Sequence, residues 1–512
     1  MAWTTAFKRS LNDPSVTVEY SLRFYRLPWA LQNSSNSLVE VGRLAIGEQD
    51  IEITGVSIVP QSWGVTFGGF TIQLVGDLRP INASALRKGN VASLYMSRNR
   101  QRPERICIGQ LRSISGVRNV WTLQFVDVLS MLYARVTNQQ SKQPFYYQAG
   151  RETTATAAFN FASAPELYVA DISTFEKDST HNGMIKIVDT THSAEDYWEY
   201  STITPTSGSA GYLTIISIGN WPTTGSHGHL HSGDVVINLA RTKGRPDKIL
   251  HRTLISINGD DTESSYDDYP NSYAVNVKWG SPIWDTADAN YWYETVLKPS
   301  SSVDLLLDIL HEEPSTEGIR VLTDNYALLG MWPVWVQDSM SIRSCQDLKT
   351  ANNVALRISD RDIIEILSHE IYSQNQSVVY VKHTYTYRTA SGSGSKSVTY
   401  NNPDALPNAE EIIRDVTAVT ERSSDTGTMV NSALQRLKPY DFRTYEELVL
   451  QVTEQAAILA AGDIVMITSD LIYGYSENQG KTYRARKGMV TGLIWRPRTR
   501  SVILTIAVGI VE

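Results

Sequence analysis

Alternating apolar and polar residues run through most of this chain and predict β-strands. A strand with one buried face shows this period of two, because successive side chains point to opposite faces. The expected strands span residues 38–53, 65–75, 184–188, 212–218, 234–239, 334–336 and 378–387. Gly, Ser, Thr and Pro separate the shorter runs and indicate turns between them. The pattern therefore predicts a mainly β fold.

Helical spacing interrupts the strands in a few places. The expected helices span residues 127–134, 303–310, 361–367, 409–419 and 429–437. Ser302 and Ser359 precede two of these helices, and serine is a favoured N-cap residue. Together with the strand at 334–336, the helices predict an α+β region in the middle of the chain.

One short pattern occurs twice, once near each end of the chain. The first copy begins at Gly89 and contains Gly109, and the second begins at Gly462 and contains Gly488. In each copy a Gly precedes an apolar strand, a long hairpin follows, the second Gly begins another strand, and an alternating strand ends the unit. The copies predict two small β-barrels, although chance similarity between ordinary β patterns is the alternative. Three such chains would make a ring of six similar units.

These patterns divide the 512 residues into four expected regions. They are an N-terminal β-barrel at 1–150, a small all-β insert at 165–245, an α+β middle domain at 246–375, and a hairpin, helices and the second β-barrel at 376–512.

Composition narrows the class of protein. Hydrophobic residues make up 42% and charged residues 20% of the chain, as in ordinary soluble globular proteins. The net charge of −8 argues against general nucleic-acid binding. Two cysteines, Cys107 and Cys345, cannot staple so long a chain, which predicts folding in a reducing cytoplasm. The N-terminus lacks the apolar core of a signal peptide, and no apolar run reaches the length of a membrane helix.

The sharpest candidate for a metal site is the alternating set His227, His229 and His231. On a strand these side chains would share one face, and in a trimer three such strands could surround one ion. An exposed polar loop is the favoured interpretation, so we predict no metal ligands. The acidic stretch at 258–268 lacks the register of an EF-hand and is expected to be a solvated loop.

No motif for catalysis or for a cofactor is found. Residues 474–482 resemble a phosphate-binding loop, but five residues separate the glycines instead of four, and a hairpin tip is expected there. There is no Gly-x-Ser-x-Gly motif, and His369 and Glu370 are not followed by a second His at the required spacing. We therefore predict no catalytic residues, no cofactor and no enzymatic activity.

Two rows of arginines lie at alternate positions near the ends of the two copies. They are Arg98, Arg100 and Arg102 in the first and Arg496, Arg498 and Arg500 in the second. Such a row could contact phosphate. In a net acidic protein, an edge that discourages strand pairing or a salt-bridge surface between subunits is the favoured interpretation.

Three stretches resemble the tail hub proteins of tailed bacteriophages, which cap the tail tube at the baseplate or tail tip. They are residues 59–74, the insert segments at 183–187, 198–200 and 231–250, and the block at 459–465. The resemblance implies a structural homotrimer that adapts the sixfold tail tube to threefold tip components and closes the DNA channel.

The same resemblance implies the partners and the location of the protein. The partners would be the tail tube or distal tail protein and the tip, spike or fibre proteins, with the tape measure protein as a further candidate. DNA would be present only in transit, no membrane anchor is expected, and assembly into the virion tail would take place in the host cytoplasm. No appended lytic domain is expected.

The alternative function is a receptor- or carbohydrate-binding tail protein. Aromatic residues cluster between 278 and 293 and could form a stacking platform, with two aspartates as hydrogen-bonding groups for a sugar; they are Trp279, Trp284, Tyr291, Trp292 and Tyr293, with Asp285 and Asp288. The favoured interpretation is that these aromatic residues fill a core or an interface. A glycosidase at this place would need a carboxylate pair that the sequence does not single out.

Overall fold

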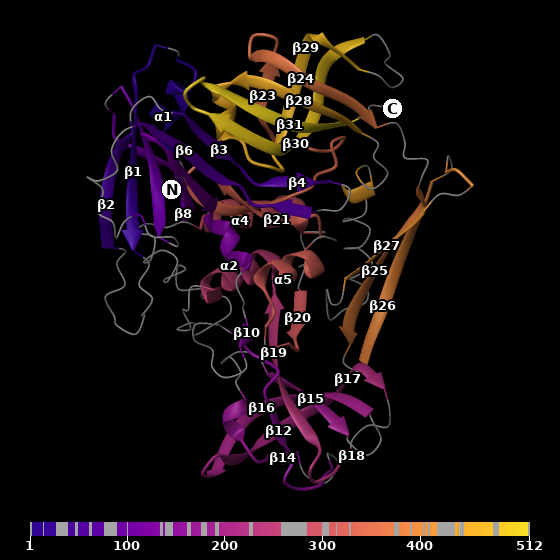
Figure 1. The fold of residues 1–512 in the computed structure, drawn as a ribbon. Coiled ribbons are helices and arrows are strands. Elements are labelled where there is room, and N and C mark those ends of the chain that lie inside the picture. Colours follow the sequence, from indigo (N-terminus) through magenta and orange to yellow (C-terminus); the bar gives the residue numbers. More distant parts are fainter. Residues whose placement is uncertain are drawn as a thin grey trace.

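Strands dominate the computed structural model of the chain, as the alternating pattern predicts (Figure 1). The structure describes residues 3–13, 15–26, 39–46, 50–60, 64–75, 86, 90–99, 101–133, 137–138, 147–160, 165–175, 182–189, 194–224, 229–257, 284–298, 307–313, 315–326, 329–372, 378–389, 392–402, 405–407, 410–416, 436–438, 440, 445–474 and 481–509.

The N-terminal half-barrel is a curled sheet of strands in the order β2-β1-β7-β8-β9-β6-β3. Its elements are α1 (Thr5–Ser10), β1 (Val18–Arg26), β2 (Val39–Ile46), β3 (Ile51–Thr54), β4 (Ser57–Val59), β5 (Gly64–Thr66), β6 (Gly69–Val75), β7 (Val91–Arg98), β8 (Glu104–Val117), β9 (Val120–Asp127) and the 3-10 helix η1 (Val128–Tyr133). The helix expected at 127–134 is therefore present, in the tighter 3-10 form.

The C-terminal half-barrel has the strand order β23-β29-β30-β31-β28-β24. Its elements are β23 (Val354–Ser359), β24 (Ile363–Tyr372), β28 (Tyr445–Thr453), the 3-10 helix η5 (Glu454–Ile458), β29 (Ile464–Gly474), β30 (Lys481–Arg496) and β31 (Ser501–Gly509). The two half-barrels lie side by side in Figure 1. Strand β3 pairs with β30, so that one 13-stranded sheet runs through both in the described part of the chain.

The two half-barrels have the same strand order. In the first, the strands β1, β3, β6, β7, β8 and β9 correspond in chain order to β23, β24, β28, β29, β30 and β31 in the second. Both sets are arranged in space as first, fourth, fifth, sixth, third and second. One difference is that β1 runs antiparallel to β7, whereas β23 runs parallel to β29.

The residue register of the two half-barrels also agrees. Gly109 of β8 lies opposite Ala92 of β7, and Gly488 of β30 lies opposite Val465 of β29. These are the glycines that the sequence pattern pairs. Because strand order and register both match, the structure agrees with the duplication that the sequence pattern indicates.

The same bulge interrupts both copies two residues beyond these glycines. The register shifts between Leu111 and Ser113 where β8 meets β9, and between Val490 and Gly492 where β30 meets β31. At the same place the Leu111 amide donates to the carbonyl of Asn90 at 2.8 Å, and the Val490 amide donates to that of Asp463 at 2.9 Å. A bulge re-aims a strand, so both copies bend at the same point.

The paired glycines should be intolerant of a side chain. A Cβ atom on Gly109 would lie 2.6 Å from the Val126 carbonyl oxygen, and one on Gly488 would lie 2.5 Å from Ile506 Cγ2. We expect Gly109→Ala and Gly488→Ala each to lower the free energy of unfolding by about 1–3 kcal/mol, measured by urea denaturation. Gly492→Ala is the control, because its nearest atoms lie at 3.6 Å. An equal loss in all three variants would contradict the steric explanation.

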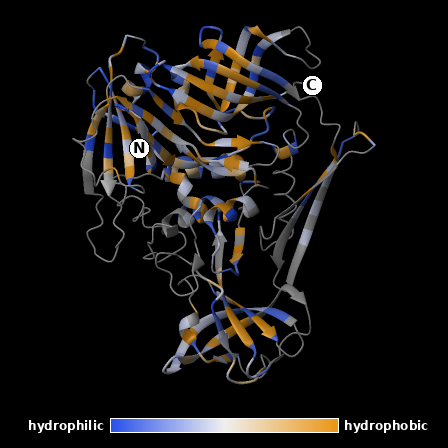
Figure 2. Ribbon diagram, in the orientation of Figure 1, coloured by the Kyte–Doolittle hydropathy of each residue, from blue (hydrophilic) through white to orange (hydrophobic). Residues whose placement is uncertain are grey.

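One apolar core is shared by the two half-barrels. Residues such as Leu22, Ile72 and Leu123 from the first and Leu450 and Leu504 from the second belong to the same buried cluster. Figure 2 shows the apolar residues concentrated along these strands and again in the insert. Burial of this surface holds the two copies together as one unit.

The all-β insert lies at the far end of the molecule from the half-barrels (Figure 1). Its main sheet has the order β12-β19-β15-β16-β17-β14 and surrounds a core that includes Trp198 and Leu213. Its elements are β10 (Thr137–Asn138), β11 (Tyr147–Gln148), β12 (Glu152–Thr154), β13 (Phe159–Asn160), β14 (Glu166–Val169), η2 (Ile172–Thr174), β15 (Gly183–Asp189), β16 (Ala194–Ser207), β17 (Ala210–Thr224), β18 (His229–Leu230) and β19 (Val235–Gly244).

Short helices and a hairpin lie between the insert and the half-barrels (Figure 1). They are α2 (Pro246–Ile257), α4 (Thr286–Trp292), the π-helix η3 (Tyr293–Leu297), α5 (Gly318–Asn325), β21 (Met331–Val336) and β22 (Ser339–Ser344). The strand predicted at 334–336 is confirmed in β21. The core of this region includes Trp332, Tyr326 and Tyr293.

The helix predicted at 303–310 is wrong. Residues from 307 onward form β20 (Leu307–His311), which pairs antiparallel with the second half of β19 from Gly244↔Leu307 to Ala240↔His311. A short apolar run does not distinguish a helix from a buried strand. Here the second half of β19 offers an edge for pairing, and residues 307–311 form a strand against it.

The helices predicted at 361–367 and 409–419 are also wrong. They are the strands β24 and β27 (Glu410–Val416). The carboxylate of Asp362 accepts hydrogen bonds from the Ser359 amide at 2.8 Å and the Ser359 hydroxyl at 2.7 Å, so the polar residues that resemble a helix cap form a turn. Most of the helix expected at 429–437 lies outside the described residues.

A three-stranded arm extends toward the insert, and one end of it lies near β17 (Figure 1). Strand β25 (Val378–Thr389) pairs antiparallel with β26 (Gly392–Asn401) and parallel with β27. The strand predicted at 378–387 is thus confirmed. At the end of this hairpin Gly392 pairs with Thr389.

Candidate assembly site

Charged side chains join the two half-barrels. The guanidinium of Arg98 on β7 contacts the carboxylate of Glu454, which begins η5, and both side chains are only 1% exposed. The indole N–H of Trp495 on β30 donates to the same carboxylate at 3.1 Å. Two charges and a ring N–H from both copies thus meet in a buried position. No local pattern around Glu454 marks it in the sequence, since 356 positions separate it from Arg98.

The second arginine row contacts the N-terminal half-barrel. Arg496 bonds Glu52 at 3.0 Å and Arg498 bonds Asp50 at 2.5 Å. Arg500 donates to the backbone carbonyl of Val16. The second row therefore forms salt bridges, but these join two parts of one chain and not two subunits. In the first row Arg98 is buried, and Arg100 lies outside the described residues.

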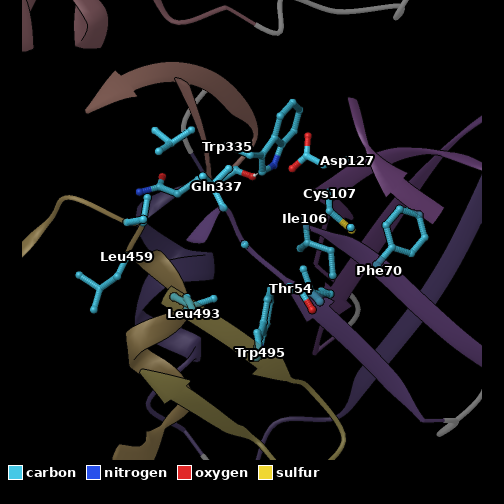
Figure 3. A pocket seen from close by; sticks show the side chains of 18 of the residues that line it. Thr54, Phe70, Ile106, Cys107, Asp127, Trp335, Gln337, Leu459, Leu493 and Trp495 are labelled. Atoms are coloured by element: carbon cyan, nitrogen blue, oxygen red, sulfur yellow. Dashed lines mark hydrogen bonds between the residues drawn. The ribbon is translucent and has the colours of Figure 1, made fainter. Parts of the chain in front are cut away.

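A small cavity of about 50 Å³ lies where the two half-barrels meet the β21–β22 hairpin (Figure 3). Figure 3 shows Trp335, Gln337, Cys107, Asp127 and Trp495 among the side chains that line it. A cofactor or sugar needs a site of several hundred Å³. The cavity has room for water but not for such a ligand.

Burial controls the two ionisable groups beside this cavity. It raises the pKa of Asp127 to about 7, even though the carboxylate accepts a hydrogen bond from the Leu129 amide at 2.8 Å. Burial also raises the pKa of the Cys107 thiol well above its ordinary value. A neutral buried thiol is a poor nucleophile. Both cysteines are free and buried.

The aromatic cluster belongs to the core of the middle region. Trp284 is 7% exposed and stacks on His251, with ring centroids 4.8 Å apart. Trp292 is 4% exposed and lies under the Arg343 guanidinium, and Tyr293 is fully buried. The favoured core interpretation is right for these three, and they offer no open platform for a sugar. Tyr291 is exposed, and Trp279 lies outside the described residues.

The two aspartates of that cluster have structural roles. Asp285 caps α4 by accepting a hydrogen bond from the Asp288 amide at 3.0 Å. Asp288 bonds Arg343 at 2.6 Å, and Arg343 also bonds Asp463 at 2.7 Å. These contacts bind the helical region to the second copy of the repeat.

The histidine triplet is not brought together as a metal site in the described residues. His227 lies outside them, and His229 lies on β18. His231 is exposed, and its amide donates to Asp234 at 2.8 Å, as expected of a polar turn. Across the described ranges, no group of three or more His, Cys, Asp and Glu could hold a metal ion. The acidic stretch at 258–268 also lies outside the described residues.

One buried polar cluster has no counterpart in the sequence prediction. Glu446 accepts hydrogen bonds from His369 at 2.9 Å and from the Tyr483 hydroxyl, and it lies 3.4 Å from Arg486. Burial opposes ionisation of Glu446, but the hydrogen bonds of His369 and Tyr483 and the charge of Arg486 lower its pKa overall. A carboxylate that three donors hold in its charged form is a poor proton acceptor, which argues against an acid–base role. The cluster instead connects β24, β28 and β30 of the second half-barrel.

The remaining sequence candidates are structural as well. Gly474 pairs with Lys481 at the end of the β29–β30 hairpin, as a hairpin tip requires, and residues 475–480 between them lie outside the described residues. Among the described helices, none has the length and apolar character needed to cross a membrane.

No known family model matches this chain, and no curated protein matches its sequence. Solved structures that resemble it include a tail protein from Neisseria meningitidis MC58, with 11% identity and a TM-score of 0.42 over 96% of both chains. A 43 kDa prophage tail protein from Shewanella oneidensis has 9% identity and a TM-score of 0.38, over 96% of this chain and 98% of that chain. A prophage tail protein from Listeria monocytogenes EGD-e has the same identity and TM-score, over 96% and 94%.

The resemblance to bacteriophage tail proteins that the sequence indicates recurs among these structures. Because their TM-scores are low, we base the function on the internal repeat of this chain.

Proposed function

We propose that this protein is a structural component of a bacteriophage tail, a trimeric hub whose six half-barrels form a ring of nearly sixfold symmetry. The observation that carries the proposal is the internal repeat, in which both copies share strand order, register and bulge position. Three chains with two such copies each present six similar units to a sixfold partner and three identical units to a threefold partner.

The proposed partners follow from this geometry and from charge. The ring would bind the hexameric tail tube or distal tail protein on one side and the tip, spike or fibre proteins on the other, with the tape measure protein in the channel. The net charge of −8 suits a channel through which DNA slides, because an acidic protein does not hold phosphate tightly. The role needs no bond chemistry, and we propose no catalytic residues.

The competing function, carbohydrate binding, would use tryptophans that are buried in the described part of the cluster. Its platform would use Trp284 and Trp292, which are 7% and 4% exposed. A stacking surface must be open to the sugar, so the observed burial favours the assembly role.

The test is the mass of the purified full-length chain in solution, measured by light scattering over a wide range of concentration. We expect a species of three times the 57.2 kDa chain mass, and a ring with six lobes in electron micrographs. A chain that stays monomeric at the highest concentration, or a dimer or tetramer, would overturn the proposed trimer.

A further inference from the structure

The joint between the two half-barrels uses one particular edge of a long strand. Strand β30 pairs with β29 over its first part and with β31 over its second part. Beyond the end of the β29 ladder, β3 occupies the vacant edge, with Thr54 opposite Ile494 and Ile53 opposite Trp495. The Gly55 amide donates to the Leu493 carbonyl at 2.9 Å and extends the ladder.

The matching strand in the first copy is β8, and no described strand pairs with the corresponding edge. Strand β8 pairs with β7 from residue 104 to 110 and with β9 from 109 to 117. The shared bulge matches Ser113 with Gly492, and hence Val117 with Arg496. Among the described strands, none pairs with residues 113–117 on the side of β7. This segment is largely exposed, and the Val117 side chain is 76% exposed.

The matching strand to β3 in the second copy is β24, and it is the last strand of the sheet as far as the structure describes it. Glu52 lies opposite Thr71, and Ser368 lies opposite Val449, which is the residue that matches Thr71. Ser368 therefore corresponds to Glu52. Among the described strands, β24 pairs only with β28, whereas β3 has partners on both sides.

The β24 edge strand carries apolar residues at its surface. The side chains of Ile364 and Leu367 are 53% and 43% exposed, and Ile366 is 37% exposed. A long edge strand of this kind invites pairing with another chain unless something covers it. In the first half-barrel the equivalent edge belongs to β3, and β30 covers it. Strand β30 is the fifth strand, in chain order, of the second half-barrel.

We propose that β24 of one copy of this chain pairs antiparallel with residues 113–117 of β8 in a second copy, and so repeats the β3–β30 joint between chains. Ser368 then lies opposite the second copy's Val117, in the positions that Glu52 and Arg496 hold within one chain. The two surfaces are different parts of the chain, so the contact is head-to-tail and repeats around a ring until it closes. The trimeric closure rests on the proposed function, whereas the strand pairing does not.

Disulfide trapping tests the register of this contact. In a chain carrying Ser368→Cys and Val117→Cys, the two thiols of neighbouring copies would lie at directly opposed strand positions, within reach of a disulfide. Mild oxidation should convert most of the chain to a covalent species of three times 57.2 kDa that a reductant returns to 57.2 kDa. Neither single variant should form this covalent species. Native Cys107 and Cys345 are buried and should stay reduced.

A matched control displaces one thiol along the same strand. In Ile364→Cys with Val117→Cys the thiols would be about 13 Å apart, at 3.3 Å per residue, which is beyond disulfide range. Equal cross-linking in the control and in the Ser368 pair would overturn the proposed register, and so would an absence of cross-links in a chain that light scattering shows to be trimeric.

Two further outcomes separate this inference from the proposed function. Cross-linked ladders that extend beyond three chains would support the β24–β8 pairing and overturn the trimeric ring. A second variant, Leu367→Asp, places a charge on the exposed edge strand directly next to the paired residues 368–372 and should convert the trimer to a monomer with an unchanged circular dichroism spectrum. A Leu367→Asp chain that remains fully trimeric would overturn the pairing and leave the hub function standing.

Discussion

Replacing Arg98 by methionine is expected to lower the free energy of unfolding by roughly 3–5 kcal/mol. The methionine keeps most of the volume of the side chain but removes the charge that faces Glu454. Both side chains are 1% exposed, so the remaining carboxylate would be a buried charge without its counter-ion. Arg98 also donates to the Ser10 carbonyl at 2.5 Å, which ties α1 to the same place. Urea denaturation followed by tryptophan fluorescence measures the loss.

Two controls show whether the loss comes from the unpaired charge. In the double variant Arg98→Met with Glu454→Gln no charge is left unpaired, and the amide oxygen can still accept from Trp495. We expect it to recover more than half of the lost stability. Arg484→Met removes an exposed ion pair, 3.8 Å from Asp470, and should change stability by less than about 1 kcal/mol. Equal small losses in Arg98→Met and Arg484→Met would contradict the role of burial.

The stability of the protein should depend on the protonation of Asp127. Its pKa is about 7 in the folded chain and near 3.8 when exposed, so the folded state binds a proton that the unfolded state releases between these values. The resulting contribution to stability is present below pH 4 and is lost as the pH rises toward 7 and above. At 1.36 kcal/mol per pKa unit, the loss amounts to up to about 4 kcal/mol.

Asp127→Asn should remove this dependence. The asparagine cannot ionise, and its amide oxygen can still accept the hydrogen bond from Leu129. We expect the variant to be more stable than the parent chain at both values, by up to about 4 kcal/mol at pH 8 and by less than half of that at pH 5, measured by urea denaturation. Asp13→Asn serves as the control, because Asp13 is exposed and its pKa is lowered, so it stays ionised across this range. The same pH slope in Asp127→Asn as in the parent would refute the assignment.

Local patterns predict the elements of this fold more reliably than its pairings. The period of two predicts strands such as 378–387, and the repeated Gly109 and Gly488 indicate the duplication, because each signal lies within a few residues. The stretches at 303–310 and 361–367 fail for the opposite reason. The first becomes β20 from residue 307 onward and the second becomes β24, because an edge of β19 and an edge of β28 are available to them. That information lies elsewhere in the chain.

The candidate site depends still more on distant contacts. The first arginine row was predicted as one surface, but Arg98 is buried by a partner that no sequence spacing connects to it. Trp284 and Trp292 lie close together in the sequence, and this spacing is the same for an open platform as for a buried core. Only their packing against His251 and Arg343 shows that they are buried. Asp127 gives no signal at all, because its pKa depends on the surfaces that close around it.

The covalent link between the two copies gives the β3–β30 joint a different dependence on dilution from any joint between chains. Within one chain the second copy is present at a fixed effective concentration, which for tethered modules reaches roughly millimolar values. This joint therefore forms as each chain folds, however dilute the solution. In a ring of three chains, half of the joints would be of this kind and half would obey mass action. Dilution would then release whole chains with their inner joint intact, and a partner that binds across two chains would act on the weaker half of the ring.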